Sequence, residues 1–151
     1  MCIRDSVQVA AQSSAVYFTL DEKELMANAD PKKTFLVFDL AVGGQNVSRN
    51  LVFFDTMHNL DLPESVHVDA SLESSNGGYA VTLHSPALAR SVYLSFGDLD
   101  VQPSDNYFDL LAGEPLKITL KTSAQLSSDQ LKSAMQVVSL TDAFPAAPTM
   151  H

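Results

Sequence analysis

Apolar and polar residues alternate in short runs along most of this chain, and turn-forming residues separate the runs. Alternation of this kind predicts half-buried β strands, because successive side chains of a strand point to opposite faces. The predicted strands are residues 7–10, 15–20, 34–42, 47–54, 65–72, 79–84, 90–96, 107–111, 116–120 and 136–140. Strands this short, repeated about every 8–12 residues, predict an all-β, antiparallel β-sandwich.

The same alternation predicts which side chains form the core. The run at 34–42 is apolar at both alternating sets of positions, so we expect burial on both faces. The other predicted core side chains are Val66, Val68, Ala70, Leu72, Tyr79, Val81, Leu83, Val92, Leu94 and Phe96.

Glycine-containing turns connect several of these strands. Residues 76–78 (NGG) give the clearest tight-hairpin signal, and residues 43–46 (GGQN) give a second one. Gly113 is expected to turn the chain between 107–111 and 116–120, which would form a final hairpin. Residues 60–63 are expected to cross between the two sheets, since Pro63 cannot donate to a strand ladder.

Two short helical turns are expected among the strands. Asp21 is placed to cap a helical turn within 21–29, and Pro31 prevents its continuation. Ser127 and Gln130 have the spacing of a capping box. Residues 145–151 have no apolar pattern and are expected to form a disordered tail.

Charge and composition exclude several classes of partner. Eighteen acidic residues against nine basic ones give a net charge of −9, which disfavours nucleic acid and anionic lipid. No apolar run reaches the length of about 18 residues that a membrane helix needs. We therefore expect no nucleic-acid partner and no membrane partner.

Acidic residues close to the final hairpin are the first candidates for chemistry. Asp98, Asp100, Asp105 and Asp109 lie on one loop and its adjoining strand. Glycoside hydrolysis needs two carboxyl groups on either side of one bond, and nothing in this spacing separates an acid from a nucleophile. Calcium coordination by Asp98, Asp100, Ser104 and Asp105 is the alternative, but their spacing does not match an EF-hand. We interpret the loop as a solvated acidic turn.

The remaining candidates also have simpler interpretations. His67 and His84 are expected to face outward on neighbouring strands, without a third ligand at metal spacing. Residues 46–48 (NVS) have the form of a glycosylation sequon, although asparagine also favours turns. Cys2 is the only cysteine, so no disulfide is available. We therefore assign no catalytic, cofactor-binding or metal-binding residue, and we expect no cofactor.

Residues 104–115 (SDNYFDLLAGEP) closely resemble a hairpin near the C-terminus of β-mannosidases, which belong to glycoside hydrolase family 2. The family commonly has proline where this chain has Ala112. Three further parts of the chain resemble the same family domain in the same order: residues 44–48, residues 50–54 with 60–63, and residues 79–83 with 88–94. The resemblance extends from about residue 14 to about residue 140.

The resemblance implies an immunoglobulin-like domain over residues 7–144 that lies outside the catalytic barrel. Such a domain would be a non-catalytic accessory part of an enzyme that hydrolyses terminal non-reducing β-D-mannose residues by a retaining mechanism. Its partners would be the neighbouring domains of the parent enzyme, which would itself bind mannosides. We therefore expect an exposed apolar surface for docking. The location that is usual for members of the family, together with the lack of further cysteines, indicates a periplasmic or secreted parent enzyme.

Residues 1–6 (MCIRDS) resemble the translated end of a sequencing-library adapter. We accordingly expect the protein proper to begin at Val7, with more polypeptide upstream.

Two other functions are compatible with the sequence. One is the equivalent domain of an exo-β-glucosaminidase. The other is a free-standing carbohydrate-binding or adhesion module, which would need solvent-facing aromatic residues. Tyr17, Tyr93 and Tyr107 are the candidates for that role.

Overall fold

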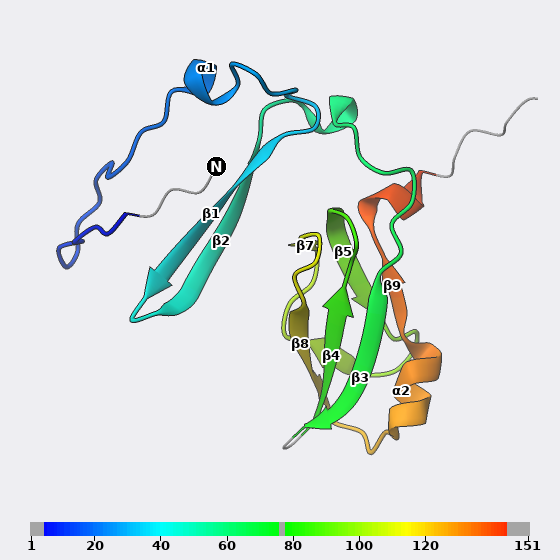
Figure 1. The fold of residues 1–151 in the computed structure, drawn as a ribbon. Coiled ribbons are helices and arrows are strands. Elements are labelled where there is room, and N and C mark those ends of the chain that lie inside the picture. Colours follow the sequence, from blue (N-terminus) through cyan, green and yellow to red (C-terminus); the bar gives the residue numbers. More distant parts are fainter. Residues whose placement is uncertain (1–4, 76–77, 145–151) are drawn as a thin grey trace, which may run out of the picture. The chain divides into compact units, whose positions relative to one another are not determined.

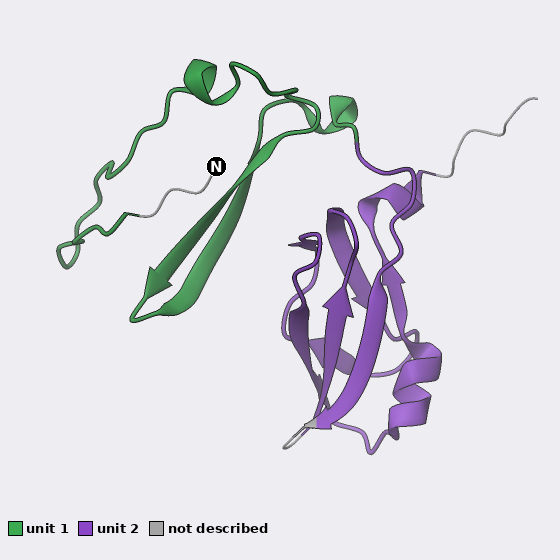
Figure 2. Cartoon of the chain, viewed as in Figure 1, with its two compact units in different colours: residues 1–61 green, residues 62–151 purple. Residues whose placement is uncertain are grey.

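The structure is a computed structural model that describes residues 5–75 and 78–144. The chain divides into two compact units, residues 1–61 and 62–151, as Figure 2 shows. The division into two units differs from the single sandwich expected over 7–144. The segment 60–63, which was expected to cross between the two sheets of one sandwich, lies at the boundary between the units. The expected disordered tail at 145–151, and residues 1–4 of the adapter-like segment, lie outside the described residues.

The first unit contains one helical turn, one hairpin and one 3₁₀ turn. These are α1 (Glu22–Leu25), β1 (Phe35–Val42), β2 (Gln45–Phe53) and η1 (Met57–Asn59) (Figure 1). The cap expected at Asp21 is present, since Oδ1 of Asp21 accepts a hydrogen bond from the Lys23 amide at 2.8 Å. Residues 7–10 and 15–20 are not strands in the structure, contrary to the prediction. Alternation by itself cannot make a strand, because the backbone groups also need a partner strand.

The β1–β2 hairpin turns at two glycines in the left-handed region. Gly43 has a φ of 59° and Gly44 a φ of 81°, which are values that the two-residue turn of a twisted hairpin requires. The ladder runs from Phe35 opposite Phe53 to Val42 opposite Gln45, with one irregularity after Leu40. At the open end the rings of Phe35 and Phe53 lie with their centroids 5.5 Å apart.

Burial of the 34–42 segment on both faces is not observed. Phe38 is 42% exposed, Leu40 is 53% exposed and Val42 is 64% exposed. No described residue of the first unit is buried. The hairpin therefore has apolar side chains on both faces and no layer covering either face within its own unit.

The second unit contains the remaining strands, in two sheets. Its elements are β3 (Asp69–Ser75), β4 (Gly78–His84), β5 (Ala89–Ser95), β6 (Val101–Pro103), β7 (Phe108–Leu110), β8 (Leu116–Thr122), α2 (Ser128–Ala134), β9 (Gln136–Val138) and η2 (Leu140–Ala143). The strand orders are β3-β4-β8-β6 and β7-β5-β9, and all the strand pairs are antiparallel. This is the expected all-β, immunoglobulin-like sandwich.

One predicted hairpin joins the two sheets instead of forming within one. β7 pairs with β5, whereas β8 pairs with β4 and β6. The segment between them is held elsewhere: Ala112 forms an isolated bridge with Ser85, and the Gly113 amide donates to the Ser85 carbonyl at 2.9 Å. Gly113 has a φ of 75°, so it does turn the chain as expected, but the turn leads into the other sheet.

Side chains from both sheets fill one core in the second unit. Its fully buried members include Val81 and Leu83 of β4, Val92 and Leu94 of β5, and Leu131 of α2. Phe96 is also buried, as predicted. Val68, Leu72 and Tyr79 are partly buried against this core, whereas Ala70 is exposed, which corrects the expectation for that residue.

A capping box closes the N-terminus of α2, and Leu131 packs this helix on the core. The expected capping box is present: the Gln130 amide donates to Oγ of Ser127, and the Ser127 amide donates to Oε1 of Gln130. β9 follows at once and pairs with β5. Among the described residues, no helix is long and apolar enough to cross a membrane.

Candidate functional site

The segment 104–109 (SDNYFD), which carried the sequence resemblance, links the two sheets of the second unit. At its start, the Ser104 amide donates to the Thr119 carbonyl at 2.8 Å, and the Thr119 amide donates to Oγ of Ser104 at 3.1 Å. These two bonds fasten the segment to β8. Oδ1 of Asp105 then accepts a hydrogen bond from the Asn106 amide at 2.8 Å.

Asn106 fastens the segment to β5 of the other sheet. Its Oδ1 accepts from the Leu94 amide at 2.7 Å, and its Nδ2 donates to the Leu94 carbonyl at 3.0 Å. One side-chain amide thus replaces the donor and the acceptor that a neighbouring strand would supply. This role of Asn106 was not predicted from the sequence. The only available signal was an asparagine between a turn and a strand.

Tyr107 adopts an uncommon backbone conformation and exposes its ring. Its φ of 62° lies in the left-handed region, which an aromatic residue rarely adopts. The ring stacks on that of Tyr93, with the centroids 4.9 Å apart and the planes at 29°. Tyr107 is 70% exposed. Two of the three tyrosines proposed for a binding surface therefore lie together, while Tyr17 belongs to the first unit.

Asp109 is engaged in holding the backbone of β5. Its Oδ1 accepts from Nε of Arg90 at 2.8 Å and from the Ser91 amide at 2.9 Å. Ser91 has a φ of 48° and lies where the β5–β7 register shifts. The side chains of Arg90 and Asp109 are only 12% and 18% exposed. This ion pair therefore stabilises a bulge and leaves Asp109 poorly placed for catalysis.

Two of the other acidic candidates lie apart from this pair. Oδ2 of Asp100 accepts from Oγ of Ser123 at 2.8 Å. Asp98 lines an open groove of about 570 Å³ between the 96–99 turn and α2. Asp129 lines the same groove from α2.

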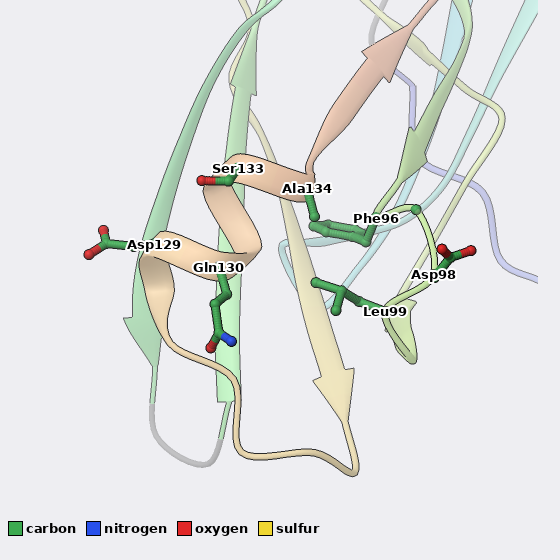
Figure 3. A pocket seen from close by; sticks show the side chains of 8 residues that line it. Phe96, Asp98, Leu99, Asp129, Gln130, Ser133 and Ala134 are labelled. Carbon is green, nitrogen blue, oxygen red and sulfur yellow. The ribbon is translucent and has the colours of Figure 1, made fainter.

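Figure 3 shows how the groove is built. Phe96, Leu99 and Ala134 form its apolar centre, while Asp98 and Asp129 point away from that centre to opposite sides. A retaining glycosidase needs two carboxyl groups about 5 Å apart that face one substrate atom. This groove does not present such a pair.

The histidine and sequon candidates also have local partners. Nε2 of His67 lies 3.2 Å from Oδ1 of Asp69, and both side chains are exposed. In the ladder, His84 lies opposite Asp69. Nδ2 of Asn46 donates to Asp39 at 3.0 Å. Within residues 5–75 and 78–144, no three His, Cys, Asp or Glu side chains form a group that could hold a metal ion.

The strongest electrostatic effects in the first unit are local ion pairs and turns. Hydrogen bonding by Arg49, at 2.6 Å from its Nε to Oδ1 of Asp39, lowers the pKa of Asp39. The hydrogen bond with Asp61 raises the pKa of Lys33. Asn59 lowers the pKa of Asp55 by donating to its Oδ1 at 2.9 Å. These groups are exposed, and none of the shifts indicates a catalytic acid or base.

The comparison with family models agrees with the division into two units. The Ig-fold domain model of mannosidases matches residues 62–143, which is more than half of the chain. This chain belongs to the mannosidase Ig-fold domain family. A second model, the mannosidase Ig/CBM-like domain, matches residues 3–59. The two matches meet at the boundary between the units, whereas the sequence resemblance had treated both parts as one domain.

Comparison with solved structures supports the fold of this mannosidase Ig-fold chain. The crystal structure of the β-D-mannosidase from Dictyoglomus thermophilum matches with a TM-score of 0.65 and 21% identity. The match covers 75% of this chain and 14% of that enzyme. No curated protein matches the chain. The chain thus has the Ig-like fold of this domain family, and the matched part spans about 14% of the length of the enzyme it resembles.

Proposed function

We propose that this chain is a non-catalytic accessory region of a β-mannosidase, which hydrolyses terminal non-reducing β-D-mannose residues. The observation that carries the proposal is the tandem match of two mannosidase-associated domains, at residues 3–59 and 62–143. The acidic residues support it, because Asp109 and Asp100 are engaged with neighbouring residues, and the groove at Asp98 lacks a facing carboxyl group.

The role of the region is to dock on other domains of the parent and to fix their arrangement. Large apolar side chains are exposed mainly in the first unit, where they include Phe18, Phe38, Leu40, Val42 and Val47. Solvent-exposed apolar area of this kind is typical of surfaces that are covered in the full protein. We propose a periplasmic or secreted location for the parent enzyme.

The test compares this chain with the full-length protein encoded at its genomic locus. We expect the complete protein to release 4-nitrophenol from 4-nitrophenyl β-D-mannopyranoside, and the 151-residue chain to release none above the buffer blank. Turnover by the 151-residue chain, abolished by Asp105→Ala, would overturn the non-catalytic role. Hydrolysis of an aryl β-glucosaminide in place of the mannoside would identify the parent as an exo-β-glucosaminidase.

The docking role has its own test in the complete protein. Phe38→Ser and Leu40→Ser should lower the midpoint of thermal unfolding and reduce mannosidase activity in parallel. A matched control, Ser48→Ala on the same hairpin, should leave both unchanged. If Phe38→Ser and Leu40→Ser behave like the control, the hairpin does not dock on the rest of the enzyme.

A further inference from the structure

The outer face of the β7-β5-β9 sheet carries a half-buried tyrosine with two exposed neighbours. Val92 and Leu94 of β5 are buried, so the intervening Tyr93 points to the outer face. Val138 of β9 lies opposite Tyr93 in the ladder and is 42% exposed. Tyr107, which is 70% exposed, stacks on Tyr93.

Several contacts hold the two tyrosine rings in this arrangement. Asn106, the residue before Tyr107, binds both backbone groups of Leu94, the residue after Tyr93. Tyr107 itself keeps a φ of 62°, a strained conformation for a residue other than glycine. The fold thus maintains a strained backbone that exposes most of a stacked aromatic residue. Strain of this kind is an indication of a functional surface.

The chemistry of the platform fits a neutral, amphipathic ring. Neither tyrosine hydroxyl has a hydrogen-bond partner among the described residues, so both are available as donors and acceptors. The nearby ion pair of Arg90 and Asp109 is internally satisfied. An aromatic face with two free hydroxyls at its edge suits a ligand that has an apolar face and polar edges. A net charge of −9 disfavours anionic ligands.

We propose that Tyr93 and Tyr107 form a carbohydrate-binding platform on which a pyranose ring stacks. The C–H face of the sugar would lie on the exposed Tyr107 ring, and its hydroxyl groups would bind the two phenol oxygens. The preferred ligand is a β-linked manno-oligosaccharide, a choice that rests on the proposed function. The platform would retain polymeric substrate close to the parent enzyme without taking part in bond cleavage.

Affinity electrophoresis of the complete 151-residue chain in gels containing soluble β-mannan tests the proposal. We expect retardation by the β-mannan and not by the same mass of dextran. Tyr107→Ala and Tyr107→Gly should each weaken binding at least tenfold. Tyr107→Phe keeps the ring, so it should bind within about threefold of the wild type. Tyr17→Ala, which removes an exposed tyrosine of the first unit, should have no effect.

Titration with mannotriose, followed by tyrosine fluorescence, gives a second readout, since the chain has no tryptophan. Because glycine favours a positive φ, Tyr107→Gly removes the ring and relieves the strain, so any loss of binding is separated from misfolding. Its circular dichroism spectrum should match that of the wild type.

Three outcomes would be informative in different ways. Folded wild-type chain that binds no sugar overturns the platform and leaves the proposed function standing, because the latter depends on hydrolysis by the complete protein. Mannan binding that survives Tyr107→Gly also overturns the platform. Binding of chito-oligosaccharides in preference to manno-oligosaccharides, lost in Tyr107→Gly, supports the platform and overturns the choice of a manno-oligosaccharide as its ligand.

Discussion

The two units have similar strand patterns but very different interiors. All the described buried residues belong to the second unit, where two sheets and α2 enclose one core. In the first unit the apolar side chains of the hairpin are exposed to solvent, and Phe38 and Leu40 are about half exposed. Alternating apolar residues therefore specify a strand and its faces, but burial depends on whether a second layer is present. An isolated two-stranded hairpin is only marginally stable in water.

Separating the two units is the most severe test of this difference. We expect residues 62–144 to unfold in a single cooperative transition on their own, because every member of the buried cluster lies in that range. Residues 1–61 should show no sharp cooperative transition, because no described residue of that unit is buried. Thermal denaturation of the two fragments measures this directly. A sharp transition for residues 1–61 would mean that the hairpin stabilises itself without a second layer.

Leu131→Ala should remove a large part of the stability of the second unit. Leu131 is the only buried residue of α2 and is completely shielded from solvent. Truncating such a leucine costs about 2–5 kcal/mol, through lost burial and the cavity that remains. Urea unfolding measures the change, and the neighbouring Lys132→Ala is the matched exposed control. A cost below about 1 kcal/mol would show that α2 contributes little to the core.

Asn106→Ala should cost about 2 kcal/mol in the free energy of unfolding, because it leaves the amide and carbonyl of Leu94 without their partner. Asp105→Ala removes one exposed hydrogen bond and should cost about 0.5 kcal/mol. Chemical denaturation of both variants gives the comparison. If the two variants lose the same free energy of unfolding, Asn106 does not take the place of a neighbouring strand in bonding the Leu94 backbone.

The sequence predicted the local features of both units well. The glycine turn at 43–44, the capping box of Ser127 and the inward positions of Val81, Leu83, Val92 and Leu94 follow from backbone preferences and period-two alternation, which act within a few residues. The strand partners were harder to predict. Gly113 marks a turn whether β7 and β8 pair or separate, so the contact of Ala112 and Gly113 with Ser85 decided the outcome.

Features that depend on distant residues could not be predicted in the same way. Asn106 acts through Leu94, and Asp109 acts through Arg90, each of them more than ten residues away. The boundary at residue 61 was missed because Pro63 and the apolar residues beside it are as suitable for a crossover between sheets as for a connection between units. The stack of Tyr93 and Tyr107 was foreseen only as two separate candidates.

The last comparison concerns the ion pairs of the two units, for which we expect the smallest effect on stability. Asp39 and Arg49 lie on the exposed hairpin, with their side chains 42% and 34% exposed. Because Arg49 lowers the pKa of Asp39 in the folded hairpin, this pair contributes stability above the ordinary aspartate pKa of 3.8. That contribution is lost as the pH falls from about 3.8 through the lowered pKa. Solvent screening limits it to about 0.5 kcal/mol.

NMR titration of the Asp39 carboxyl carbon in the complete chain measures this effect. The midpoint should lie below the value for an unfolded peptide and move upward in Arg49→Gln or in about 1 M salt, where exposed charges are screened. In the second unit the side chains of Arg90 and Asp109 are only 12% and 18% exposed, so added salt should screen the contribution of that ion pair to stability less. If Asp39 titrates at its unfolded value, the β1–β2 register at Asp39 and Arg49 is not maintained in solution. The first unit would then lack a stable hairpin as well as a core.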